Sequence, residues 1–199
     1  CQPVPMNRLL QGDVGSGKTA VAAAACYFAA KNGVQSALMA PTEILAGQHY
    51  ATLQRFLEPL GISVGLLTGS KKAKEKKEVR TATQDGSLMV LVGTHAIFQN
   101  EVQFSNLALV STDEQHRFGV GQREAMFKKG EAPHTLIMSA TPIPRTLAII
   151  LYSNTDISII GSRPEGRIPI KNCVVGPGYR KTAYKFIYDE IKKGRQAYI

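Results

Sequence analysis

A glycine-rich loop between an apolar run and an alanine-rich run is the feature that most constrains how this chain can fold. Residues Gly12–Thr19 read Gly-Asp-Val-Gly-Ser-Gly-Lys-Thr, which is the Gly-x-x-x-x-Gly-Lys-Thr pattern of a phosphate-binding loop, or P-loop. The loop follows the apolar run Arg8–Gln11 and opens the helical stretch Ala20–Ala30, the context that the motif requires. We therefore predict a strand, a P-loop and a helix in direct succession.

The residue types of this loop suit a nucleoside triphosphate with Mg²⁺. Glycines let backbone N–H groups close around phosphate oxygens, and the following helix directs its positive end at the same point. Lys18 is expected to reach the β- and γ-phosphates, and Thr19 to place its hydroxyl on Mg²⁺. The loop residues predicted to bind the nucleotide are Gly12, Gly15, Ser16, Gly17, Lys18 and Thr19.

An acidic pair later in the chain supplies what a P-loop lacks. The apolar run Leu107–Val110 leads into Asp113-Glu114-Gln115-His116. Asp113 can hold the metal through water, and Glu114 can polarise the attacking water. An acidic pair alone could be an ordinary polar strand end, but the P-loop favours the catalytic interpretation. With Lys18 and Glu114 as catalytic residues, we predict hydrolysis of the nucleotide and not binding alone.

The composition favours an anionic partner such as nucleic acid, because the formal net charge is +9 and the pI is near 9.6. Three cysteines, Cys1, Cys26 and Cys173, are far apart and show neither metal-ligand spacing nor a disulfide framework, which indicates reduced thiols in the cytosol. The longest apolar stretch, Val21–Ala30, is short and alanine-rich, so we expect a buried helix and no membrane span. No signal peptide is visible.

Apolar strand-like runs alternate with helical runs, as in a mostly parallel sheet with helices on both faces. We predict an α/β fold with a P-loop, and ligands at the carboxyl ends of the strands, where both motifs lie. The predicted strands are Leu9–Gln11, Ala37–Ala40, Val64–Leu67, Leu88–Val92, Leu107–Ser111 and Thr135–Met138. The predicted helices are Lys18–Asn32, Glu43–Leu57, Lys72–Thr83, Gly121–Lys128 and Arg145–Tyr152.

A change of composition predicts a domain boundary. Residues 161–169 are rich in Gly, Pro and Arg, which is typical of a linker. Residues 1–160 should form the first domain. Residues 170–199, with a predicted strand Lys171–Val175 and helix Tyr179–Lys193, should begin a second domain. Because the chain lacks an initiator Met and ends inside an apolar run, we expect an excerpt of a longer protein.

Small residues follow three other predicted strands. Thr42 lies in Pro-Thr-Glu-Ile-Leu, Gly69 follows Thr68, and Thr94 follows Gly93. Hydroxyls and backbone N–H groups at strand ends can grip a sugar-phosphate backbone without reading bases. Each residue taken alone could be a helix cap or a turn residue. As a set beside a P-loop, Thr42, Gly69 and Thr94 favour a nucleic-acid track.

Three further features have two interpretations each. Ser139 and Thr141 follow the sixth strand, where their hydroxyls could couple the nucleotide site to the track or simply cap a turn before a helix that starts with Pro. The charged run Lys71–Glu78 favours a solvated helix face over a phosphate-binding patch. The histidines His49, His95 and His134 are scattered and suggest no metal site, whereas His116 lies in a motif.

Taken in order from Met6 to about Leu151, these motifs resemble superfamily 2 helicases and translocases. The resemblance implies that the first domain is a RecA-like P-loop NTPase domain and that residues 170–199 begin a second RecA-like domain. Three stretches are similar to the RecG family: Met6–Thr19, Asp113–Val120 and Ala140–Ala148. The linker with Arg163-Pro164, followed by Gly194–Tyr198, fits that family's entry into its second motor domain. The transcription-repair coupling translocase shares the second and third stretches but usually carries Glu where this chain has Gln115, so it remains the alternative.

The resemblance implies an ATP-dependent DNA motor that remodels branched DNA and stalled replication forks in recombination and repair. ATP and Mg²⁺ would be its cofactors, and it would act as a monomeric motor in a bacterial cytoplasm, associated with the nucleoid and with no membrane. It also implies a junction-wedge domain before Cys1, and the rest of the second motor domain, with an arginine finger, after Ile199.

By motif match, the resemblance assigns roles residue by residue. Lys18 and Thr19 would bind ATP·Mg²⁺, with Asp113 on the metal and Glu114 on the hydrolytic water. The remaining motif residues would connect nucleotide and DNA. Gln115 and His116 would link the nucleotide to the Ser139–Thr141 motif, which couples to DNA. The residues expected to touch the DNA backbone are Thr42, Gly69 and Thr94.

Two departures and one rival hypothesis complete the sequence analysis. Ser111 and Thr112 stand where the family usually has aliphatic residues, and Gly47 should weaken its predicted helix by about 1 kcal/mol relative to Ala. The rival is a nucleotide-binding switch module that never moves along nucleic acid. A GTPase-type switch needs an Asn-Lys-x-Asp motif to read the base, and we find none in the sequence.

Overall fold

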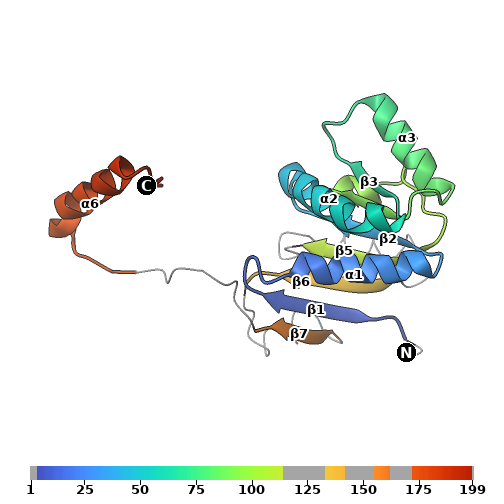
Figure 1. Cartoon of the computed structure of the whole chain (residues 1–199), viewed down its shortest axis with the longest axis horizontal. Coiled ribbons are helices and arrows are strands. Elements are labelled where there is room, and N and C mark those ends of the chain that lie inside the picture. Colours follow the sequence, from blue (N-terminus) through green and yellow to red (C-terminus); the bar gives the residue numbers. More distant parts are fainter. Residues whose placement is uncertain (1–3, 114–132, 142–154, 162–171, 199) are drawn as a thin grey trace. The chain divides into compact units, whose positions relative to one another are not determined.

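The structure is a computed structural model that describes residues 4–113, 133–141, 155–161 and 172–198 (Figure 1). The chain divides into two compact units, Cys1–Pro164 and Glu165–Ile199. The assignment of residues 1–160 and 170–199 to a first motor domain and the start of a second stays a prediction.

The first unit is built on a seven-stranded sheet with the order β3-β4-β2-β5-β6-β1-β7. Every strand pairs with its neighbours in parallel, so the predicted α/β class is confirmed. The strands are β1 Asn7–Gly12, β2 Gln35–Met39, β3 Val64–Leu67, β4 Val90–Gly93, β5 Leu107–Asp113, β6 His134–Ser139 and β7 Asp156–Ile160. Six of them overlap the predicted strands, and β7 was not predicted.

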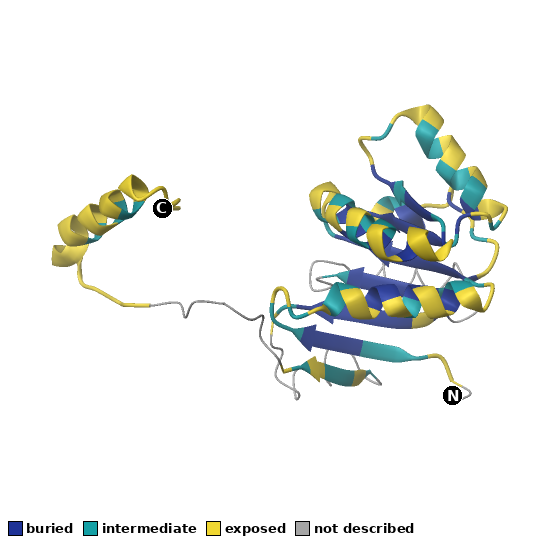
Figure 2. Ribbon diagram, in the orientation of Figure 1, coloured by how far each residue is buried: buried dark blue, intermediate teal, exposed yellow. Residues whose placement is uncertain are grey.

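The helices of the first unit also follow the predictions where the structure describes them. They are α1 Lys18–Lys31, α2 Glu43–Leu57 and α3 Ala73–Gln84, with short 3₁₀ turns η1 Glu58–Leu60 and η2 His95–Phe98. The predicted helices Gly121–Lys128 and Arg145–Tyr152 lie outside the described residues. Figure 2 shows that the middle strands are almost entirely buried, whereas the helices expose one side.

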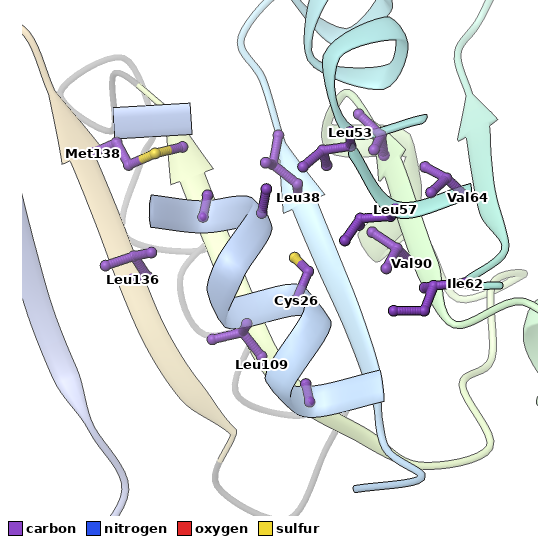
Figure 3. Close-up of a cluster of buried hydrophobic side chains, with 14 of the residues drawn as sticks. Cys26, Leu38, Leu53, Leu57, Ile62, Val64, Val90, Leu109, Leu136 and Met138 are labelled. Atoms are coloured by element: carbon purple, nitrogen blue, oxygen red, sulfur yellow. The ribbon is translucent and has the colours of Figure 1, made fainter. Parts of the chain in front are cut away.

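Helices α1 and α2 cover one face of the sheet through a cluster of buried apolar side chains (Figure 3). Alanines and Cys26 of α1 let this helix lie close to the strands, and Leu53 and Leu57 of α2 extend the cluster toward β3 and β4. Burial raises the pKa of the Cys26 thiol to about 12, and a hydrogen bond with Ser36 only partly offsets that rise. Cys26 is therefore an inert core residue at neutral pH.

The opposite face is covered by α3 and η2. Val79 and Ala82 of α3 and Ile97 and Phe98 of η2 pack against a second cluster, which includes Met39 of β2. Helical segments therefore lie on both faces of the sheet, as the fold-class prediction requires.

Gln35, at the start of β2, forms hydrogen bonds with the end of α3 and with the segments that precede β4 and β5. Its side-chain amide donates to the carbonyl oxygens of Thr83 and Leu88, both at 2.8 Å, and its side-chain oxygen accepts from the Asn106 amide at 3.0 Å. Gln35 is 2% exposed, so these bonds replace the water that burial removes. They join the end of α3 to the chain segments that lead into β4 and β5.

The second unit is described from residue 172 to residue 198. It contains the 3₁₀ turn η4 Pro177–Tyr179 and the helix α6 Arg180–Lys192, which confirms the predicted helix there. The predicted strand Lys171–Val175 is wrong for its described part, because Asn172–Val175 form no strand. A strand needs a neighbour to pair with, and the described part of this unit provides none. Among the described residues, no helix is both long and apolar enough to cross a membrane.

Candidate nucleotide and nucleic-acid sites

The P-loop connects the end of β1 to the first residue of α1, and its glycines are set by local geometry. Gly15 and Gly17 have φ values of 80° and 98°, in the left-handed region that L side chains rarely adopt. Gly12 is limited by space instead. A Cβ there would lie 2.4 Å from Ser16 Oγ and 3.1 Å from Ile160 Cβ. Three of the predicted nucleotide-binding residues are therefore positions at which a side chain would distort the loop.

Lys18 is drawn across the loop that precedes it. Its Nζ donates to the carbonyl oxygens of Gly12 at 2.7 Å and Asp13 at 3.0 Å. The loop is tightened by the Ser16 amide, which donates to the Asp13 carbonyl at 3.1 Å, and by the Val14 amide, which donates to the Asp13 carboxylate at 2.8 Å. The ammonium group thus lies against the backbone that would surround a phosphate.

The start of α1 offers further donors to an anion. Gly17 is its N-cap, no described side chain caps the helix, and its first turn contains no acidic residue. The buried Ser16 hydroxyl has no hydrogen-bond partner among the described residues. Uncapped N–H groups at a helix N-terminus carry partial positive charge. The loop therefore fits a phosphate group, which would accept from these donors.

Asp113 lies at the carboxyl end of β5, which is the second strand from the P-loop strand β1 in the sheet. Strand β6 separates β5 from β1, and the register aligns Asp113 with Met138 and Met138 with Leu10. Two strand spacings amount to about 10 Å. The candidate metal ligand Asp113 thus lies near the loop that carries Thr19, the other candidate ligand.

Asp113 has a partner that the sequence analysis did not find. His49 of α2 places Nε2 2.8 Å from Asp113 Oδ2, and both side chains are largely buried. A signal was present: His49 occupies the apolar face of α2 with Ala46 and Leu53, and a polar residue on such a face needs a partner. The sequence analysis considered His49 only as a possible metal ligand, from its spacing along the chain, and such spacing does not show contacts across the fold.

Ser111 and Thr112, the departures noted in β5, are both fully buried. Their hydroxyls have no hydrogen-bond partner within the described parts of the chain. Leaving a buried hydroxyl unpaired costs about 1–3 kcal/mol. Aliphatic residues would avoid this cost, so the departure lowers stability next to Asp113.

The other motif residues are only partly described. Glu114, Gln115 and His116 lie outside the described residues. Ser139 and Thr141 are described at the end of β6, where the Ser139 hydroxyl lies 2.9 Å from the Thr141 hydroxyl and accepts from the Thr141 amide at 3.2 Å. The two predicted coupling residues therefore form one small hydrogen-bonded group beside the P-loop strand.

Two of the three predicted DNA-contact residues line one pocket of about 250 Å³. Gly69 and Thr94 bound it from the ends of β3 and β4, and α3 adds Lys76 and Arg80. Lys76 Nζ donates to the Gly69 carbonyl at 2.6 Å. The charged run is thus divided: Lys76 faces the pocket, while Lys71 pairs across the surface with a glutamate at i+4.

Thr42 does not line this pocket but directly precedes Glu43, which does, and it caps α2. Its Oγ1 accepts from the Leu45 amide at 3.3 Å, so the helix-cap interpretation holds for Thr42. The next residue, Glu43, lines the pocket and accepts from the Ser70 amide at 3.1 Å. Hydrogen bonding from Ser70 is the main cause that lowers the pKa of Glu43.

Comparison with known proteins places this geometry in a family. A family model described as DEAD/DEAH box helicase matches residues 4–150. The ATP-dependent DNA helicase RecG of Bacillus subtilis is 53% identical over 197 residues, covering 99% of this chain and 29% of the relative. RecG of Aquifex aeolicus is 50% identical over 198 residues, covering 98% of this chain and 25% of the relative. The chain thus spans less than a third of the length of these curated relatives.

Solved structures agree with the sequence matches. RecG bound to a three-way DNA junction superposes with a TM-score of 0.83 and 42% identity, covering 98% of this chain and 26% of that one. The Hef helicase domain of Pyrococcus furiosus shares the fold, with a TM-score of 0.60 and 22% identity over 79% of this chain and 35% of that one. The predicted resemblance to RecG is confirmed, and the chain belongs to the DEAD/DEAH box helicase family.

Proposed function

We propose that this chain contains the ATP-hydrolysing part of a DNA helicase that remodels branched DNA, including stalled replication forks. The observation that carries the proposal is the P-loop, whose Lys18, uncapped helix start and unpaired Ser16 hydroxyl lie near Asp113 at one edge of the sheet. The relatives named ATP-dependent DNA helicase RecG, one of them solved on a three-way DNA junction, support the choice of DNA.

Each residue has a defined part in this proposal. Bound ATP with Mg²⁺ would supply the phosphoryl group and a divalent charge. Lys18 would neutralise phosphate oxygens, Thr19 and Asp113 would hold the metal, and Glu114 would orient the attacking water. The residues proposed to pass the state of the nucleotide to the DNA track are Gln115, His116, Ser139 and Thr141.

The DNA track would run past the pocket between α3 and the ends of β3 and β4. Gly69 and Thr94 bring backbone and hydroxyl groups to its wall, and Lys76 and Arg80 bring positive charge. Phosphate contacts of this kind position a protein on nucleic acid without reading the sequence. Because they release counterions, we expect DNA binding that weakens steeply with salt.

The domain assignment and the physiological setting are proposals as well. We assign residues 1–160 to the first motor domain, residues 161–169 to a linker and residues 170–199 to the start of the second. The division of the chain at Pro164 supports that order. We further propose a monomeric motor that acts in the cytoplasm on nucleoid DNA, and light scattering of the full-length protein would test the monomer.

Substitution of Lys18 tests the proposal. Lys18→Ala in the full-length protein should lower DNA-stimulated ATP turnover by orders of magnitude, because it removes the cation at the transferred phosphate. Glu114→Gln should instead keep ATP binding and lose hydrolysis, since the phosphate and metal ligands remain. If Lys18→Ala turns over ATP within about threefold of the wild-type rate, its activation barrier has risen by less than about 1 kcal/mol. That result would contradict the assignment of Lys18 to the phosphates. ATP turnover in the wild type that DNA does not stimulate would favour a switch module.

A further inference from the structure

We propose that His49 is a positioning residue, which holds Asp113 in place and ties it to the helix that carries the DNA-side residue Thr42. The inference rests on the proposed function, because it assigns Asp113 to the metal and Thr42 to the DNA track. Nothing in the motif pattern assigns a role to His49. The geometry of α2 and β5 supplies one.

The contact between the two side chains is short and shielded. His49 Nε2 lies 2.8 Å from Asp113 Oδ2, and the side chains are 11% and 15% exposed. A carboxylate can only accept hydrogen bonds, so Nε2 carries the hydrogen and donates it. A charge-assisted bond in such a shielded place is stronger and more directional than one on the surface.

The bond occupies only one of the two carboxylate oxygens. Oδ2 is held by His49, and within the described part of the chain Oδ1 stays available to a cation or to a water on that cation. Removal of a residue that fixes a metal ligand in this way typically lowers metal affinity or activity by about 10- to 100-fold. His49 therefore sets which oxygen of Asp113 faces the nucleotide and how firmly it is held.

Packing alone does not account for a histidine at this position. Ala46, Leu53 and Leu57 form the rest of the buried face of α2, and a leucine would continue that face. A buried imidazole costs free energy unless its polar atoms are paired. The side chain that pairs with it is the acidic residue at the end of β5, which favours a role in the site over a role in the core.

Helix α2 joins this bond to the DNA side of the molecule. Its N-cap is Thr42, and its first residue, Glu43, lines the pocket proposed for DNA and binds the Ser70 amide. His49 lies about two helical turns further along the same helix. A rigid helix carries a displacement at one end to the other. Movement of α2 on DNA would thus shift the donor that holds Asp113.

The test compares three substitutions in the full-length protein. His49→Gln keeps an N–H donor near the position of Nε2, His49→Asn retracts it, and His49→Leu removes it. Leu53→Ala, on the same helix face but away from Asp113, is the matched control for damage to the core. For each variant we would measure nucleotide binding by titration with a fluorescent ATP analogue, in EDTA and at rising Mg²⁺ concentrations. We would also measure the kcat and KM of ATP turnover with and without forked DNA.

We expect His49→Leu and His49→Asn to raise the Mg²⁺ concentration for half-maximal nucleotide binding by about 10- to 100-fold and to reduce DNA stimulation of kcat. Binding in EDTA should stay unchanged, and His49→Gln should restore most of both properties. Leu53→Ala should lower the melting temperature and leave the Mg²⁺ midpoint in place. If His49→Leu does not fold, the comparison of Gln with Asn decides.

Equal Mg²⁺ midpoints for wild type, His49→Asn and His49→Gln would overturn the proposal, because His49 would then only fill space. Failure of the proposed function looks different: the wild type itself would show neither Mg²⁺-dependent nucleotide binding nor DNA-stimulated turnover.

Discussion

Gly12 is a residue whose replacement should disable the P-loop without touching its charge. A Cβ at this position would lie 2.4 Å from the buried Ser16 Oγ and 3.1 Å from Ile160 Cβ. Such overpacking costs about 1–3 kcal/mol and would be relieved by moving the loop. Gly12→Ala should therefore weaken ATP binding by about 5- to 150-fold, as measured by titration with a fluorescent ATP analogue.

The control for this prediction lies in the same loop. Val14 is 68% exposed, so Val14→Ala should leave ATP binding close to wild type. Unchanged affinity in Gly12→Ala would mean that Ser16 moves aside without disturbing the phosphate-binding groups.

At the residue scale, the sequence predicted the loop well and the support of Asp113 poorly. The P-loop residues are contiguous in the sequence, so the motif spacing alone predicts how they are arranged in space. His49 and Asp113 are on different elements, and only the packing of α2 over the sheet brings them to 2.8 Å. The place of His49 on the apolar face of α2 indicated that it needs a partner, but not that the partner is Asp113.

At the element scale, a glycine inside α2 lowers the stability of this helix. Gly47 lies inside the helix, and a Cβ there would meet no atom within 4 Å. Replacing an interior helical glycine by alanine removes a backbone-entropy cost of about 1 kcal/mol. Gly47→Ala should therefore raise the free energy of unfolding by about 1 kcal/mol, measured by urea denaturation.

Gly93 provides the contrast to Gly47. A Cβ on Gly93 would lie 2.2 Å from the Leu67 carbonyl oxygen and 2.5 Å from Ile97 Cγ2, so Gly93→Ala should lower the free energy of unfolding. Destabilisation by both substitutions would show that α2 needs Gly47 for a reason other than space.

Prediction of the elements succeeded where both a pattern and a partner exist. Six strands were predicted, because apolar runs bounded by turns identify buried parallel strands. Strand β7 was missed because it lies at a sheet edge, where its short run Asp156–Ile160 is only partly buried. Its partner β1 is also far away in the sequence, although the two strands are neighbours in the sheet. Asn172–Val175 show the reverse case, an apolar pattern with no neighbouring strand in the part of its unit that the structure describes.

At the scale of the whole molecule, the chain should bind nucleotide better than it turns it over. It spans 25% and 29% of the two curated relatives described above. In related NTPases an arginine from outside the P-loop domain contributes about 10³–10⁵-fold in rate. Residues 1–199 alone should therefore bind ATP weakly and release phosphate at a rate that forked DNA barely changes.

Phosphate release by residues 1–199, measured with and without forked DNA and beside the full-length protein, tests this expectation. The Lys18→Ala form of the same segment gives the background rate. Strong stimulation of residues 1–199 by DNA would show that one domain contains a complete active site.

The pairing of β7 with β1 determines how mechanical load would reach the nucleotide loop. After Ile160, whose register partner is Gly12, the chain continues toward the second unit. A pull on Gly161 along the strand axis would stretch the whole ladder between β7 and β1 in shear, together with the bonds from Arg8 to Asp156 and Ser158. Bonds loaded in parallel yield together and not one after another. Tension applied to the chain after β7 would therefore reach the P-loop strand β1 before β7 separates from the sheet.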